Sequence, residues 1–239
     1  MSELESAGVL QPLTQRWQYL QERVARACER AGRSPQDITI VAVTKAASEP
    51  QLQAAYALGL RDLGESRPQQ LARRSNILPT DTRWHLIGHL QRNKLALACR
   101  HAWMIHSVDR WSLWHSLFEY AERAVQPLPR LLIEVNVSGE GTKQGFSPEE
   151  LRQHADRWFM SSAIQPLGLM TMAPLTADPE RVRPVFRQLR AIRDELRQLT
   201  GRPDILPQLS MGMSGDFEVA IEEGATMIRI GSLLFAPDA

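Results

Sequence analysis

The sequence predicts an α/β protein whose eight strand-then-helix units close into a (β/α)8, TIM-type barrel, with one additional helix at the N-terminus. Strand-like and helix-like segments alternate along the chain, which implies parallel strands joined by helical crossovers. Eight such units in about 200 residues suit a closed barrel better than an open sheet. No linker, repeat or low-complexity stretch divides the 239 residues. We therefore expect a single domain over residues 1–239, with the additional helix at about 13–31 and the barrel at about 36–235.

Each expected strand is a short apolar run, and most of the runs are rich in β-branched residues and too short for a typical helix. The run at 130–137 alternates enough to be ambiguous, and its β-branched residues favour a strand. The eight expected strands lie at 38–45, 60–63, 84–87, 104–107, 130–137, 164–170, 206–210 and 226–230.

Helix signals separate these runs. The amphipathic stretch at 13–31 has apolar residues at helical spacing, and Gly32 ends it. Ser48 caps the start of the next helix. The longest helix, 178–199, contains Pro184, so it either begins late or bends there. The helices expected between and after the strands lie at 48–59, from 66 to about 76, and at 93–100, 109–125, 148–160, 178–199 and 214–224, with a last helix or turn after 230.

Composition excludes several classes of protein. The formal net charge is +1, which favours neither a nucleic-acid partner nor a membrane surface. Cys28 and Cys99 lack the spacing of a metal site, so we expect free thiols in a reducing compartment. The first residues do not resemble a signal peptide, and no apolar run is long enough to span a bilayer. We expect a cytoplasmic protein without a metal site.

Lys45 ends the first predicted strand and is the first candidate for chemistry. Active sites of such barrels lie at the C-terminal ends of the strands, which places Lys45 at the mouth. An amine that loses hydration there favours its neutral form, which can attack an aldehyde or ketone to form a Schiff base. The alternative is a lysine that reaches out to solvent, and position alone favours this alternative.

Two glycine-containing loops predict an anion site. Residues 210–216 follow the seventh strand, and residues 229–232 end the eighth. In (β/α)8 enzymes the loops after strands seven and eight frequently form a phosphate site. Ser214 lies where a helix begins, so its hydroxyl and the free N–H groups nearby could bind phosphate oxygens. The alternative is that Ser214 only caps that helix.

Other polar residues leave their roles open. Arg229 lies within the apolar eighth strand, and alternation does not decide whether it faces inward toward a ligand or outward toward a helix carboxylate. His85 and His89 are four residues apart, but on a strand and its loop, so we expect structural histidines and no metal pair. The arginines of the longest helix favour a solvated face; they are Arg187, Arg190, Arg193 and Arg197.

Several longer motifs resemble one family across residues 15–235. The chain resembles the fold-type III pyridoxal-phosphate (PLP) barrel shared with alanine racemase, and above all the single-domain PLP homeostasis proteins (YggS/PROSC-like). Residues 84–94 resemble that family's WHxIGxLQxNK signature. The other matching motifs are Val43-Thr44-Lys45, Lys143-Gln144-Gly145, Gly168-Leu169-Met170, residues 209–216 and residues 227–232.

The resemblance implies a role for each site residue. Lys45 would form the Schiff base with PLP, and Arg229 would face the pyridine nitrogen. One departure concerns Ser66, because the family pattern usually has asparagine there, which puts that contact to the cofactor in doubt. The residues implied to hold the phosphate are Ser214, Gly231 and Ser232, assisted by backbone near Met213.

The chemistry favours a carrier over a catalyst. An arginine beside the pyridine nitrogen disfavours its protonation, and unprotonated PLP is a poorer electron sink. Nine residues follow Ile230, so we expect no second domain with an opposing base. We expect a monomer that binds PLP reversibly, hands it to apo-enzymes in vitamin B6 homeostasis, and lacks strong catalytic activity. The alternatives are a fold-type III PLP-dependent racemase or decarboxylase, and a cofactor-free Schiff-base aldolase acting through Lys45.

Overall fold

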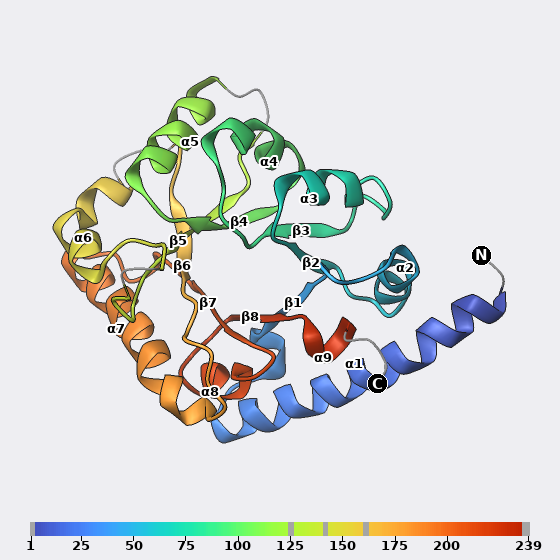
Figure 1. The fold of residues 1–239 in the computed structure, drawn as a ribbon. Helices are drawn as coiled ribbons and strands as arrows, with labels where there is room; N and C mark the ends of the chain where they lie inside the picture. Colours follow the sequence, from blue (N-terminus) through green and yellow to red (C-terminus); the bar gives the residue numbers. More distant parts are fainter. Residues whose placement is uncertain (1–2, 124–126, 141–142, 160–162, 236–239) are drawn as a thin grey trace.

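The computed structural model describes residues 3–123, 127–140, 143–159 and 163–235, and these form the predicted closed barrel of parallel strands (Figure 1). Strands that follow one another in the sequence pair in space, and the last strand closes on the first, with Val41 opposite Arg229. The strands are β1 (Thr39–Val43), β2 (Asp62–Glu65), β3 (Arg83–Leu86), β4 (Met104–Val108), β5 (Arg130–Glu134), β6 (Pro166–Met170), β7 (Gln208–Met213) and β8 (Met227–Ile230).

Helices surround the barrel on its outer side (Figure 1). The α-helices are α1 (Glu3–Arg30), α2 (Glu49–Ala57), α3 (Pro68–Arg74), α4 (Leu95–His101), α5 (Trp111–Arg123), α6 (Pro148–Gln153), α7 (Arg183–Thr200), α8 (Phe217–Glu222) and α9 (Ser232–Phe235). Short 3-10 turns lie at Pro35–Asp37, Arg92–Lys94, Ala155–Phe159 and Pro179–Val182. The additional helix α1 runs along the outside of the barrel and packs against α2, α8 and α9.

Several predicted helices differ from the structure at their ends. Helix α1 begins well before the expected residue 13, because Val9 and Leu10 extend its apolar face against the core. The helix expected at 148–160 ends at Gln153 and continues as a 3-10 turn to Phe159, while its last expected residue lies outside the described ranges. Helix α7 does begin late, with Pro184 in its first turn, where a missing N–H costs nothing.

Several predicted strands also differ at their ends. Strand β2 covers 62–65 and not 60–63, since Gly64 and Glu65 pair with β3. Strand β7 begins at Gln208, because Leu206 has a positive φ of 51°, which a strand residue cannot adopt. The strand then continues to Met213, past the expected residue 210. Strand β5 ends at Glu134, short of the expected residue 137. The shift of β2 brings Glu65 into the strand, at the C-terminal end of the barrel wall.

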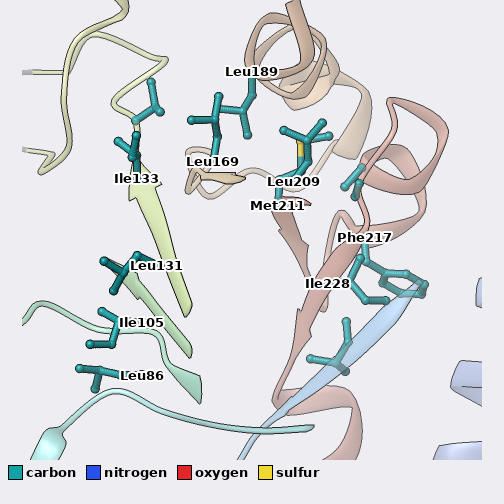
Figure 2. Close-up of a cluster of buried hydrophobic side chains, with 14 of the residues drawn as sticks. Leu86, Ile105, Leu131, Ile133, Leu169, Leu189, Leu209, Met211, Phe217 and Ile228 are labelled. Atoms are coloured by element: carbon teal, nitrogen blue, oxygen red, sulfur yellow. The ribbon is translucent and has the colours of Figure 1, made fainter. Parts of the chain in front are cut away.

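The core has two shells. The larger shell lies between the strands and the helices, where side chains such as Leu209 of β7 pack near Leu189 of α7 (Figure 2). The smaller shell lies inside the barrel and consists of Met104, Leu132, Met170 and Met227. Side chains alternate along a strand, so residues two positions from these also face the barrel interior. The interior of this barrel therefore carries polar side chains beside a methionine-rich core.

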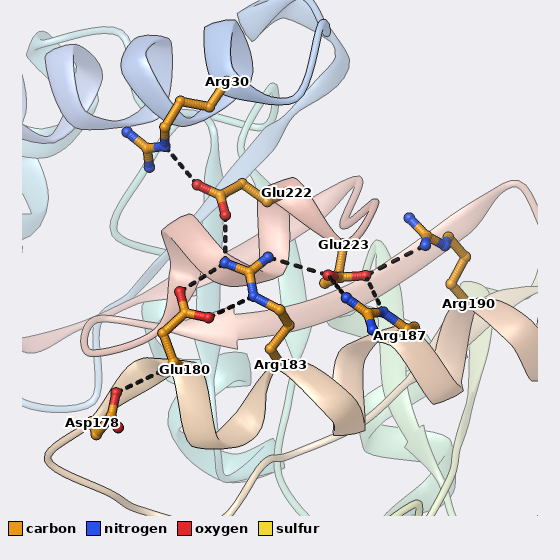
Figure 3. Close-up of polar contacts among 8 residues, drawn as sticks. All are labelled: Arg30, Asp178, Glu180, Arg183, Arg187, Arg190, Glu222 and Glu223. Atoms are coloured by element: carbon orange, nitrogen blue, oxygen red, sulfur yellow. Dashed lines mark hydrogen bonds and ion pairs between the residues drawn. The ribbon is translucent and has the colours of Figure 1, made fainter.

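Ion pairs join α7 to its neighbours (Figure 3). Arg183 donates to Glu222 over 2.6 Å, and Glu222 also accepts from Arg30 of α1 over 2.6 Å. Glu223 is buried and pairs with Arg183, Arg187 and Arg190. Burial opposes its ionisation, but the hydrogen bonds from Arg187 and Arg183, together with the charge of Arg190, outweigh burial and hold the pKa of Glu223 below its ordinary value. Two of the arginines expected on a solvated face, Arg187 and Arg190, thus pair with the residue that follows α8.

Two features are absent from the described ranges. No helix there combines the length and the apolar character needed to cross a bilayer. No cluster of three or more histidine, cysteine or acidic side chains there could hold a metal ion. Cys28 and Cys99 are both free thiols, as expected.

Candidate functional site

A cavity of about 440 Å³ lies at the C-terminal ends of the barrel strands. Strand ends that are far apart in the sequence meet there because all eight strands run parallel. All six residues that the sequence singled out line this one cavity: Lys45, Met213, Ser214, Arg229, Gly231 and Ser232. The structure therefore brings together the amine, the two loops and the arginine.

Lys45 lies just beyond β1 and is exposed. The expectation that the strand end removes hydration from its amine is wrong, because the residue follows buried Thr44 out of the barrel wall. Within the described ranges, the Lys45 amine has no hydrogen-bond or ion-pair partner. It is a primary amine at the cavity, free to react with a bound ligand.

Hydrogen bonds from α3 hold the backbone on both sides of Lys45. Arg74 of α3 donates to the carbonyl of Thr44 and, over 2.7 Å, to the carbonyl of Ala47. The same guanidinium forms an ion pair with the fully buried Glu65 over 2.5 Å, and Glu65 accepts a further hydrogen bond from the Thr44 hydroxyl. Buried charges need such paired and hydrogen-bonded partners. This cluster holds the segment that presents Lys45.

Ser214 does not cap helix α8. Asp216 occupies the N-cap position, and its carboxylate accepts from the backbone N–H of Met213 over 2.5 Å. The Ser214 hydroxyl instead accepts from the backbone N–H of Gly231 over 3.3 Å, which joins the loop after β7 to the loop after β8. The capping alternative for Ser214 is therefore excluded.

The turn after β7 leaves donors for a ligand. The Met213 N–H is already occupied by Asp216, whereas the N–H groups of Ser214 and Gly215 have no protein acceptor in the part of the chain that the structure describes. Gly212 has a φ of 91°, and an added Cβ would lie 2.5 Å from the Cβ of Ala220. Only glycine permits this close turn. Two free amides and the Ser214 hydroxyl suit a phosphate group.

Arg229 faces inward, which settles the alternative that the sequence left open. It is buried on β8 and lies on the same strand face as Met227 of the interior core. Its guanidinium donates to the Ser210 carbonyl over 2.9 Å, to the Ser210 hydroxyl over 2.7 Å and to the Thr171 carbonyl over 2.9 Å. Burial lowers the pKa of Arg229 to about 10, and the charges of Glu134 and Asp216 oppose that change. The guanidinium is charged at neutral pH.

Glu134, which was not predicted from the sequence, ends β5 and lines the cavity. Burial, reinforced by the negative charge of Asp109, raises the pKa of this carboxyl to about 7, while Arg229 opposes the change. An acidic residue at the end of a barrel strand was the signal that could have revealed it. A carboxyl with this pKa can take up or release a proton near neutral pH.

His89 is a second acid–base group at the cavity. Its Nδ1 lies 2.8 Å from the buried carboxylate of Asp109, which also accepts from Arg110. If His89 donates its Nδ1–H to Asp109, its Nε2 is left as an acceptor, and it has no partner in the described ranges. The sequence assigned His89 a structural role, whereas the structure places it at the site.

The comparisons with known proteins agree on one family. The family model for the alanine racemase N-terminal domain matches residues 17–238. A pyridoxal phosphate homeostasis protein of Aquifex aeolicus is 43% identical over 90% of this chain and 93% of its own. The chain belongs to the pyridoxal phosphate homeostasis protein family.

Two solved structures resemble this chain to different degrees. PipY of Synechococcus elongatus, solved with PLP bound, is 34% identical with a TM-score of 0.77, over 90% of this chain and 99% of that chain. Alanine racemase of Corynebacterium glutamicum shares the fold at 13% identity and a TM-score of 0.68, over 96% of this chain and 62% of that chain. Ser66 also lines the cavity.

Proposed function

We propose that this protein binds PLP reversibly through Lys45 and serves PLP homeostasis by holding the cofactor and handing it to apo-enzymes. One observation carries the proposal. A primary amine, a set of anion donors and a buried guanidinium line the same cavity in a chain of the homeostasis family. We further propose that the protein acts as a monomer.

The residues present fit the three chemical parts of PLP. The Lys45 amine matches the aldehyde, and the free amides of Ser214 and Gly215 match the phosphate. The hydroxyls of Ser214 and Ser232 line the same cavity and add two further donors. The Arg229 guanidinium matches the pyridine nitrogen as a donor to an acceptor. When bound, PLP supplies an aldehyde that condenses with a primary amine and a ring that can accept electrons.

Protons must move when a cofactor joins to or leaves Lys45. The attacking amine must first be neutral, and water must leave or return. His89 Nε2 and the Glu134 carboxyl line the same cavity and can accept or return these protons. We propose that they assist loading and release, with Asp109 orienting the His89 ring through Nδ1.

Arg229 limits stronger catalysis. A guanidinium can donate but cannot accept a hydrogen bond, so a ring nitrogen facing it stays unprotonated. An unprotonated ring withdraws electrons weakly, which disfavours carbanion chemistry at a bound amino acid. We therefore propose that the protein is a carrier and not an efficient enzyme.

A transfer assay tests the proposal. Protein loaded with PLP and freed of excess cofactor is mixed with a PLP-dependent apo-enzyme, with a phosphatase present to destroy free PLP. We expect the apo-enzyme to regain activity, and the same amount of free PLP to restore much less. Failure of the loaded protein to reactivate the apo-enzyme above the free-PLP control would contradict delivery.

A racemase or decarboxylase is the second candidate, because Glu134 and His89 supply the acid–base groups that such chemistry requires. Proteins of both activities share this fold at low identity. Incubating the PLP-loaded protein with a panel of amino acids in deuterated water discriminates the two functions. Rapid exchange of an α-hydrogen would favour an enzyme, and slow exchange with every amino acid would favour the carrier. Loss of carboxylate as carbon dioxide would identify a decarboxylase.

A further inference from the structure

A chain of hydrogen bonds crosses the barrel interior from the candidate PLP site to the opposite opening. Arg229 donates to the Ser210 hydroxyl over 2.7 Å, and that hydroxyl lies 2.9 Å from Nδ1 of His106. Nε2 of His106 lies 2.9 Å from Nδ1 of His85, whose Nε2 lies 3.0 Å from the Asp62 carboxylate. Ser210, His106 and His85 are fully buried.

The two ends of this chain fix its direction. A guanidinium can only donate and an ionised carboxylate can only accept. With both imidazoles neutral, three protons are available for three links, and one arrangement satisfies them all. Ser210 donates to Nδ1 of His106, His106 donates from Nε2 to His85, and His85 donates from Nε2 to Asp62. Every member is thereby satisfied in a place where an unpaired polar group would be costly.

The charges around the chain are consistent with this arrangement. Burial, together with the nearby His85 and Arg229, lowers the pKa of His106 well below its ordinary value, so its ring is neutral. Burial opposes ionisation of Asp62, but hydrogen bonds from His85 and Arg83 outweigh it and lower the pKa of that carboxyl. The other charged groups that face the chain are Glu134 and Asp216, both beside Arg229.

Asp62 lies at the start of β2, at the far end of the barrel from Lys45. It lines a separate cavity of about 400 Å³, together with Arg83 and residues of α1 such as Trp17. Arg83 donates to both Asp62 oxygens, over 2.8 and 2.5 Å. The chain therefore connects two openings through an otherwise apolar, methionine-rich interior.

We infer that Ser210, His106 and His85 are positioning residues for Arg229, forming a relay that is anchored on Asp62 and holds the guanidinium toward the PLP site. The inference rests on the proposed function for the ligand, but the relay itself exists without it. A Ser210 hydroxyl committed to His106 presents its lone pairs to Arg229. Without His106 the hydroxyl can rotate and donate elsewhere, and the guanidinium loses one of its three fixed acceptors.

Nuclear magnetic resonance on the protein without PLP tests the relay. Imidazole ¹⁵N shifts should show His85 and His106 both neutral with the proton on Nε2. In His106→Leu, the Arg229 guanidinium protons should exchange with water about tenfold faster, as expected for the loss of one buried, charge-assisted hydrogen bond. Met104→Leu, an apolar change on the same strand and the same inward face, is the matched control and should leave exchange unchanged.

His106→Gln tests the chemistry of the link, because its amide can both donate to His85 and accept from Ser210. It should restore slow exchange in part. If His106→Leu fails to fold, the wild-type ring shifts and His106→Gln still decide the question. Either ring carrying its proton on Nδ1, or Arg229 exchange that is equal in the wild type and the folded His106 variants, would overturn the relay.

PLP affinity gives the second measurement. The dissociation constant should rise about tenfold in His106→Leu and stay within about twofold in Met104→Leu. Equal affinities of the wild type and His106→Leu would overturn the inference while leaving the proposed function intact. A wild-type protein that does not bind PLP would overturn the proposed function, and the experiment without PLP would still decide the relay.

Discussion

Arg74 and Glu65 form a buried ion pair, 2.5 Å between Nη1 and Oε1, directly beneath the segment that carries Lys45. The arginine also donates to the carbonyls on both sides of Lys45, at Thr44 and Ala47. Side chains of β2 and α3 thus hold the backbone that carries Lys45, which follows β1. A preorganised amine of this kind needs less ordering when a ligand arrives.

We predict that Arg74→Met lowers the free energy of unfolding by about 3 kcal/mol, because it leaves the Glu65 carboxylate buried and unpaired. It should also weaken PLP binding by releasing the backbone around Lys45. The adjacent Arg73→Met is the control, since Arg73 pairs with Glu49 on the exposed face of the same helix. Exposed pairs contribute little, so Arg73→Met should change neither quantity appreciably. Equal effects in urea denaturation of the two variants would refute this role for Arg74.

Glu134 should make stability depend on pH. Its pKa is raised from 4.5 to about 7, so the folded state binds a proton that the unfolded state has already lost. Stability therefore falls as the pH rises from about 4.5 to about 7, by up to about 3 kcal/mol from this group. Glu134→Gln should lack this component and be more stable than the wild type at pH 8. Chemical denaturation of both proteins at pH 5 and pH 8 checks it, and parallel pH profiles would disprove it.

Ser214→Ala should raise the dissociation constant for PLP about tenfold, because one hydroxyl at the anion donors is lost and the bridge from Gly231 to the loop after β7 is broken. Ser147→Ala is the matched control. Its hydroxyl caps α6 and accepts from Glu150, away from the cavity. That control should cost about 1 kcal/mol of stability and leave affinity unchanged. Comparable loss of affinity in both variants, measured by PLP titration, would count against a phosphate role for Ser214.

Much of the fold and the outline of the site could be predicted from the sequence. Strand–helix alternation and the length of the chain determine the barrel, and a barrel brings all strand ends to one face. Lys45, Ser214, Arg229 and Ser232 could therefore be placed together from their positions at strand ends and loops. Gly32 and Ser48 likewise marked helix ends that the structure shows.

The remaining features depend on register and tertiary contacts. Strand β7 begins later than its apolar residues suggest because Leu206 has a positive φ, which no propensity indicates. The inward direction of Arg229 follows from its pairing register and not from its neighbours in the sequence. The relay links His106 to Ser210, which lies 104 positions later in the sequence. Local sequence patterns cannot predict such a contact.

The most direct test of the central claim is an absorbance spectrum of the protein before and after addition of PLP, recorded beside Lys45→Ala. We predict a band near 420 nm, roughly where lysine-bound PLP absorbs, in the wild type and its absence in Lys45→Ala. Borohydride reduction should then fix a pyridoxyl group on Lys45, detectable by mass spectrometry. Featureless spectra for both proteins, or equal bands in both, would contradict the assignment of Lys45 as the PLP-binding residue.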